Sequence, residues 1–252
     1  MHILVYTLCA VIVLTVVAFG QVNIEASRLP QNSEDGIYIT SELGYEVKRG
    51  NTHVTEIKSK LRTDYIKGKH HTFLSARYEY GASADQAFKD AKYAHLRHTY
   101  MVWKHIGVEE FVQTQSREFN DLKLRQLFGV GSRFEMKSDM LVFALGTGAM
   151  LEYEDLAHSS STEWVIRSTN YVSARHKLGE KDSPLQAYAI VYVQPLISSM
   201  NDFRVLADIG LEYRVFDILS IVNSFNTLYD TRPPNGVGRF DLSNGLKLRV
   251  VW

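Results

Sequence analysis

The chain has 252 residues, and its 28 lysines and arginines are balanced by 28 aspartates and glutamates. This balance excludes the global basic surplus that is typical of nucleic-acid-binding proteins, so we expect no nucleic-acid partner. The single cysteine, Cys9, excludes an intramolecular disulfide and a thiolate metal site, and we expect no cofactor.

The chain begins with an apolar segment that resembles an export signal. Residues 3–19 are apolar apart from two threonines, and the small residues Ala18 and Gly20 precede the polar Gln21. This pattern predicts a signal peptide over residues 1–20, cleaved after Gly20. The alternative is a retained anchor helix, because an apolar run of about 17 residues is at the lower limit for crossing a bilayer.

The remainder of the chain has no second apolar run long enough for a membrane helix, so entry into a bilayer requires strands. Residues 21–36 are predicted to form a short periplasmic leader. Residues 37–252 contain twelve alternating segments, each ending in a cluster of turn-forming residues. They start near Ile37, His53, His70, Ala91, Ile106, Lys123, Met140, Glu163, Leu185, Asp202, Ile218 and Phe240.

The two faces of these segments differ sharply in polarity. Between residues 203 and 215, one face carries Phe203, Val205, Ala207, Ile209, Leu211, Tyr213 and Val215. The other carries Arg204, Asp208, Gly210, Glu212 and Arg214, with Leu206 as the exception. A soluble barrel buries the apolar face, whereas a membrane barrel directs it towards lipid and lines its interior with the charged face.

Two observations favour the membrane barrel. Aromatic residues gather near the segment ends, where interfacial girdles form. Long connections (82–90, 118–122, 155–162 and 231–239) mostly alternate with short ones (104–105, 137–139 and 216–217), although 179–184 and 198–201 fit less well. The predicted fold is therefore an all-β, antiparallel, up-and-down transmembrane barrel of about twelve strands, with both termini periplasmic and long connections external.

Several strings along the chain carry a resemblance to a known family. They are RYEYG (77–81), QTQSREFNDLKLRQLFGVGSRFE (113–135), LGTGAMLEYE (145–154), QPLISSMNDFRVLADIGLEYRV (194–215) and YDTRPPNGVGRFDLSNGLKLRV (229–250). In order and spacing they resemble the salt-induced outer membrane protein family, domain of unknown function family 481. The resemblance covers about residues 37–252. It implies a Gram-negative outer-membrane barrel and carries no activity or catalytic residue.

The end of the chain suggests a partner. Gly245 precedes four apolar residues at two-residue spacing, Leu246, Leu248, Val250 and Trp252. We interpret them as an assembly signal that the barrel-assembly machinery captures by edge pairing. The alternative is a closing strand that only contacts outer-membrane lipid.

Charged residues on the polar faces are the candidates for lining the lumen. They are Arg125, Arg133, Glu135, Glu152, Arg204, Asp208, Glu212, Arg214, Lys247 and Arg249. They could set the selectivity of a pore, or they could pair with one another and fill the interior.

We expect a non-enzymatic envelope protein in the cell outer membrane, acting as a narrow passive channel or as a stress-related barrel with a filled lumen. One alternative is a membrane-embedded lipid hydrolase or acyltransferase, which would need a lipid-facing nucleophile and base such as Ser75 and His71. Another is an adhesion or assembly partner that acts through the external loops.

Overall fold

The computed structural model describes residues 34–48, 54–83, 86–117, 122–157, 163–233 and 238–252. The predicted signal peptide and most of the predicted leader lie outside these residues. Within them, no helix has the length and apolar character needed to cross a membrane.

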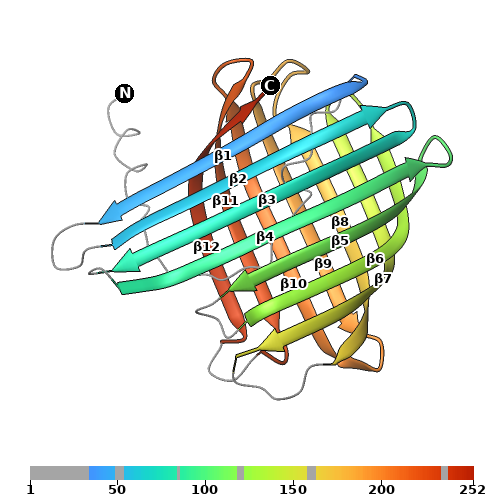
Figure 1. Cartoon of the computed structure of the whole chain (residues 1–252). Helices are drawn as coiled ribbons and strands as arrows, with labels where there is room; N and C mark the ends of the chain where they lie inside the picture. The colour runs from blue at the N-terminus through green and yellow to red at the C-terminus, as the bar shows by residue number, and fades with distance from the viewer. Residues whose placement is uncertain (1–33, 49–53, 84–85, 118–121, 158–162, 234–237) are drawn as a thin grey trace, which may run out of the picture.

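The described residues form twelve strands (Figure 1). Their bounds are β1 Gly36–Lys48, β2 Val54–Lys67, β3 His70–Ser83, β4 Gln86–Met101, β5 Ile106–Arg117, β6 Leu122–Lys137, β7 Leu141–Leu156, β8 Trp164–Lys177, β9 Leu185–Leu196, β10 Ser199–Arg214, β11 Leu219–Asp230 and β12 Phe240–Val251.

Each strand pairs antiparallel with its neighbours in sequence, and β12 pairs with β1 to close the sheet into a barrel. The prediction of a twelve-stranded up-and-down barrel is confirmed. The start of β1 and the end of β12 lie at one end, which we call the terminal end; the opposite end is the far end (Figure 1). Short turns such as 68–69 connect the strands at the terminal end.

The predicted loop 82–90 is wrong, because β3 continues to Ser83 and β4 begins at Gln86 rather than near Ala91. A register shift between Gly81 and Ala82 accommodates the difference in length between the two strands. The polar residues there are strand residues: the ammonium of Lys89 points inward and pairs with Glu56 at 2.5 Å and Glu79 at 2.7 Å.

The predicted hairpin 198–201 is also wrong in its position. β9 ends at Leu196 and β10 begins at Ser199, so the turn is residues 197–198. Residues 199–201 belong to the strand, and a register shift between Ser199 and Phe203 follows the turn. Such a shift is typical of a β-bulge, which bends a strand locally without ending it.

The polarity of the wall is inverted relative to a soluble barrel, as the sequence predicts. On β10, Arg204, Asp208 and Glu212 are buried inside the barrel, whereas Ile209 is 55% exposed on the outside. Leu206, the exception in the alternation, lies inside with the charged residues.

Three inward-facing aromatic rings lie flat against glycines of the neighbouring strand. Tyr171 is directly opposite Gly146 in the β7–β8 pairing, and a Cβ added to Gly146 would lie 2.0 Å from the ring. Phe111 lies against Gly129, and Tyr188 against Gly210, in the same way. The glycines therefore let these rings rest on the wall of the barrel.

A methyl group at Gly146 tests this packing. Gly146→Ala must displace the Tyr171 ring or the strand, and overpacking of this kind costs about 1–3 kcal/mol in the free energy of unfolding. The matched control is Gly245→Ala, because a Cβ at Gly245 meets no atom within 4 Å. Urea unfolding in lipid vesicles measures both, and equal stabilities of the two variants would contradict the packing.

Candidate functional site

The interior near the far end is built around Glu152 on β7. Its carboxylate pairs with Arg125 on β6, with Arg167 on β8 at 2.5 Å, and with Arg204 on β10 at 2.6 Å. Because β8 and β9 separate β7 from β10, the Arg204 side chain spans the interior rather than following the wall.

Further acidic groups complete this set, which we call the Glu152 cluster. Arg204 also pairs with Glu154 at 3.1 Å and Asp230 at 2.8 Å, and Arg167 pairs with Asp202 at 2.9 Å. Three guanidinium groups thus meet four carboxylates. Burial of a charge is tolerated where several partners share it. The members of the cluster come from β6, β7, β8, β10 and β11, so the cluster ties five strands together.

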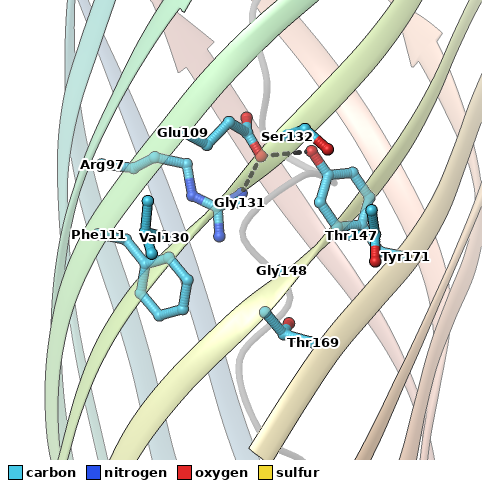
Figure 2. Close-up of a pocket in the computed structure, with 10 residues that line it drawn as sticks. All are labelled: Arg97, Glu109, Phe111, Val130, Gly131, Ser132, Thr147, Gly148, Thr169 and Tyr171. Carbon is cyan, nitrogen blue, oxygen red and sulfur yellow. Dashed lines mark hydrogen bonds and ion pairs between the residues drawn. The ribbon is translucent and has the colours of Figure 1, made fainter.

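A second set, the Glu109 cluster, lies nearer the terminal end. Figure 2 shows Glu109 between Arg97 and Tyr171. The Tyr171 hydroxyl on β8 donates to Glu109 on β5 at 2.6 Å and accepts from Arg133 on β6 at 2.7 Å. Arg97 on β4 pairs with Glu109 at 3.2 Å, and Arg133 pairs with Glu135 at 2.8 Å. The phenol therefore links β8 to β5 across the interior.

A third set, the Glu42 cluster, lies beside the junction of β1 and β12. Arg249 on β12 pairs with Glu42 on β1 at 2.9 Å and with Glu212 on β10 at 2.5 Å. Arg175 and Lys247 approach the same two carboxylates at 3.6 and 3.4 Å. Positive and negative groups again alternate in space, and this pairing extends over strands that are not neighbours.

Between the clusters, aromatic and aliphatic side chains lie together with uncharged polar ones such as Gln113 and Gln194. His95 stacks between Phe73 and Phe111, at ring-centroid distances of 5.7 and 5.4 Å. One pocket lies between Arg97 and the Gly131–Gly148 part of the wall (Figure 2), and it leaves about 10 Å³ in which the centre of a water molecule can lie. A second pocket, lined in part by His95, leaves about 20 Å³. Each has room for about one water.

The structure places eight of the ten candidate lumen residues in buried positions inside the barrel: Arg125, Arg133, Glu135, Glu152, Arg204, Asp208, Glu212 and Arg249. Lys247 also faces inward and is 27% exposed in its side chain. Arg214 does not belong with them. It is the last residue of β10 and is exposed, because the strand reaches the rim of the barrel there.

Several cluster members were absent from the sequence-based set. Arg97, Glu109, Arg167 and Glu42 occupy the same alternating inward positions as the residues that were chosen. Period-two alternation could have found these four. The role of Tyr171 could not have been found in this way, since its hydroxyl meets Glu109 only after the barrel has closed.

The residues nominated for a hydrolase lie on the wrong face. Ser75 is buried inside the barrel, and His71 points inward, where its Nε2 is 2.7 Å from Asp64 Oδ1. A lipid-modifying enzyme of the kind considered would need both groups on the outward face. This placement removes the pair on which that alternative depended.

The barrel is similar to solved structures of other proteins. The porin NanC has a solved structure with a TM-score of 0.50 and 10% sequence identity, covering 86% of this chain and 98% of that one. The translocator domain of the autotransporter NalP from Neisseria meningitidis has a TM-score of 0.48 and 9% identity, covering 88% and 89%. At such identities the likeness to the porin concerns the fold.

No curated protein matches the sequence. Residues 41–252 match the profile of the family described as "Protein of unknown function, DUF481", and this description contains no reference to salt induction. Because the match covers most of the strands and the whole of the interior described above, the chain belongs to the DUF481 family.

Proposed function

We propose that this protein is a non-enzymatic barrel of the bacterial outer membrane that acts as a narrow passive channel for small hydrophilic solutes. The inverted polarity of the wall supports the membrane location, because apolar side chains such as Ile209 and Leu246 are exposed on the outside while buried charges are inside. We place both termini on the periplasmic side, which makes the far end external.

The observation that carries the channel proposal is the arrangement of the interior groups. Charged side chains occur at both ends of the interior, and the mid-height rings of Phe111, Tyr171 and Tyr188 rest on wall glycines. A polar route through this interior requires the paired arginine side chains to move, because each mid-height pocket holds about one water. Because acidic and basic groups alternate along it, we expect weak ion selectivity.

A second candidate is a barrel with a filled lumen, as in a structural or stress-related envelope protein. The water-sized pockets at mid-height favour it, since neither has room for a solute larger than water. The two candidates differ in one measurable property, which is conductance in a planar bilayer.

The double variant Arg204→Ala/Asp230→Ala tests the route. It removes one positive and one negative group, and with them the side chain that spans the far end of the interior. We expect small conductance steps for the unmodified protein and steps roughly twofold larger or more for the variant, because the far end of its interior is wider.

The control variant is Lys181→Ala/Asp139→Ala, which removes an exposed ion pair of 2.7 Å between two turns at the terminal end. Its conductance should equal that of the unmodified protein. Absence of steps in the unmodified protein together with large steps in the Arg204 variant would favour the filled lumen. Absence of steps in every variant would exclude the channel.

The C-terminal strand is proposed to be the assembly signal. The Trp252 side chain is exposed, whereas its backbone exchanges two hydrogen bonds with Ile39, at 2.8 and 3.0 Å. Replacement of the side chain therefore leaves the closing bonds in place and alters what an assembly factor can recognise.

We expect Trp252→Ala to lower the amount of folded barrel in cell membranes severalfold, while refolding of the purified chain into vesicles is unchanged. Trp252→Phe should restore assembly in cells because it keeps an aromatic terminus. Heat-modifiable migration measures folding in both settings. An equal defect in cells and in vesicles would assign Trp252 to stability instead of recognition.

A further inference from the structure

Two histidines lie side by side on the outer face of the barrel, at its terminal end. His70 is the first residue of β3, and His98 lies on β4, where its neighbours on the outward face are the exposed Leu96 and Tyr100. Nδ1 of His70 is 3.4 Å from Nε2 of His98. The Tyr100 ring packs against His70 at a centroid distance of 4.8 Å. Each imidazole therefore directs one ring nitrogen towards the other outside the wall.

The separation of these two nitrogens suits a metal ion. A histidine nitrogen lies about 2.0–2.1 Å from a bound zinc ion, so two such ligands at a tetrahedral angle are about 3.3–3.4 Å apart. The distance between His70 and His98 falls in this range. It is longer than the distances of about 2.7–3.2 Å that N–H donors usually keep to an oxygen acceptor. The two rings are thus spaced as a pair of ligands.

Thr72 gives His98 a fixed orientation. The two residues are directly opposite in the β3–β4 pairing, and Oγ1 of Thr72 is 2.7 Å from Nδ1 of His98. A histidine that binds a metal usually donates its second N–H to an oxygen, which fixes the tautomer and the plane of the ring. When the Nδ1 proton of His98 is donated to Thr72, the lone pair of Nε2 is available to an ion.

The charges beside the pair have opposite signs. Glu110 on β5 is directly opposite His98 and is exposed, whereas Lys67 on β2 is directly opposite His70. Directly opposite side chains have Cβ atoms about 4.5–5.5 Å apart, so both charges act on an ion held by the two imidazoles. Among the described residues, no three histidine, cysteine, aspartate or glutamate side chains gather as metal ligands. Two imidazoles are therefore the protein ligands, and water supplies the others.

Water reaches this part of the wall. His70 directly follows the turn 68–69, and Trp103, which is 66% exposed, lies in the next turn at the terminal end. Exposed aromatic side chains of this kind are typical of the membrane–water interface. On the other side of the histidines, Leu74 and Leu96 are opposite one another and exposed on the apolar outer face. The pair thus lies where the apolar face meets the rim.

We infer that His70 and His98 form a binding site for a divalent transition-metal ion, held by Nδ1 of His70 and Nε2 of His98 on the outer face of the barrel. Imidazole nitrogen suits zinc, copper and nickel, whereas calcium and magnesium prefer oxygen ligands. The site is separate from the lumen, so it goes beyond the proposed function, and the conductance measurements do not bear on it.

Copper tests the site, because electron paramagnetic resonance of Cu²⁺ reveals its nitrogen ligands. The full chain refolded into phosphatidylcholine nanodiscs, with glycine present to compete for weak sites, should bind one Cu²⁺ with couplings from two imidazole nitrogens. His70→Ala and His98→Ala should each lower the affinity about tenfold or more, since each removes one ligand. Heat-modifiable migration confirms that both variants contain the folded barrel.

The matched control is His105→Ala/His176→Ala, which removes two other histidines of the terminal end. Their Nδ1 atoms are 3.0 and 3.1 Å from the backbone oxygens of Glu135 and Met140, so neither faces a second histidine. The control should keep the copper affinity and the two-nitrogen signal. An equal loss in the control would show adventitious binding and overturn the site. Unchanged affinity in the His70 and His98 variants would overturn it as well.

Zinc titration against a competing indicator tests the surroundings of the ion without removing a ligand. Thr72→Val should lower the affinity for Zn²⁺ severalfold, because His98 loses the partner that orients it, and Thr72→Ser should restore it. Glu110→Gln should lower the affinity and Lys67→Gln should raise it, because the two changes remove charges of opposite sign. A shift in the same direction in both charge variants, or no effect of Thr72→Val, would place the ion elsewhere and overturn the site.

Discussion

A guanidinium group that is turned into the interior of a barrel needs an anion, and this constraint shapes the whole interior of the protein. Arg204 reaches past two strands to Glu152, and Arg249 reaches past β11 to Glu212. Removal of one member of such a pair leaves an uncompensated buried charge, which costs about 3–5 kcal/mol. The pairs therefore brace the wall across the interior, in addition to the hydrogen bonds between adjacent strands.

The same constraint limits what the interior can do. Groups of both signs are used mainly to satisfy one another, which disfavours strong ion selectivity. The two pockets described at mid-height each hold about one water. Glu42 and Glu56 are each shared by two cations, and two of these cations, Arg249 and Lys89, have further partners in Glu212 and Glu79.

Much of this fold could be predicted from alternation alone. Most strand starts agree with the structure within one residue, and the segment 203–213 shows the correct inward and outward faces, including the inward Leu206. Alternation failed near residues 82–90, where the sequence analysis predicted a loop. A charged residue on a membrane strand has the same sequence signature as one in a turn, and only its partners, Glu56 and Glu79, distinguish them.

The candidate site was less predictable, because its contacts join residues far apart in sequence. Alternation identifies Glu152 and Arg204 as inward-facing. The ion pair between them spans the interior, so it depends on the curvature of the closed barrel. Arg214 shows the converse error: it continues the alternation correctly, yet its strand has already reached the rim. The short pairing between β1 and β12 has no sequence signature, since it depends on the stagger between the first and last strands.

The central claim is that the charged face of each strand points inward and the apolar face outward to lipid. Single spin labels placed one at a time at residues 203–213 of the protein in lipid vesicles test it most directly, by accessibility to membrane-dissolved oxygen. The account predicts a period of two, with high accessibility at Val205, Ala207, Ile209 and Leu211 and low accessibility at the residues between them. Maxima at Arg204, Asp208 and Glu212, or a uniform profile, would contradict it.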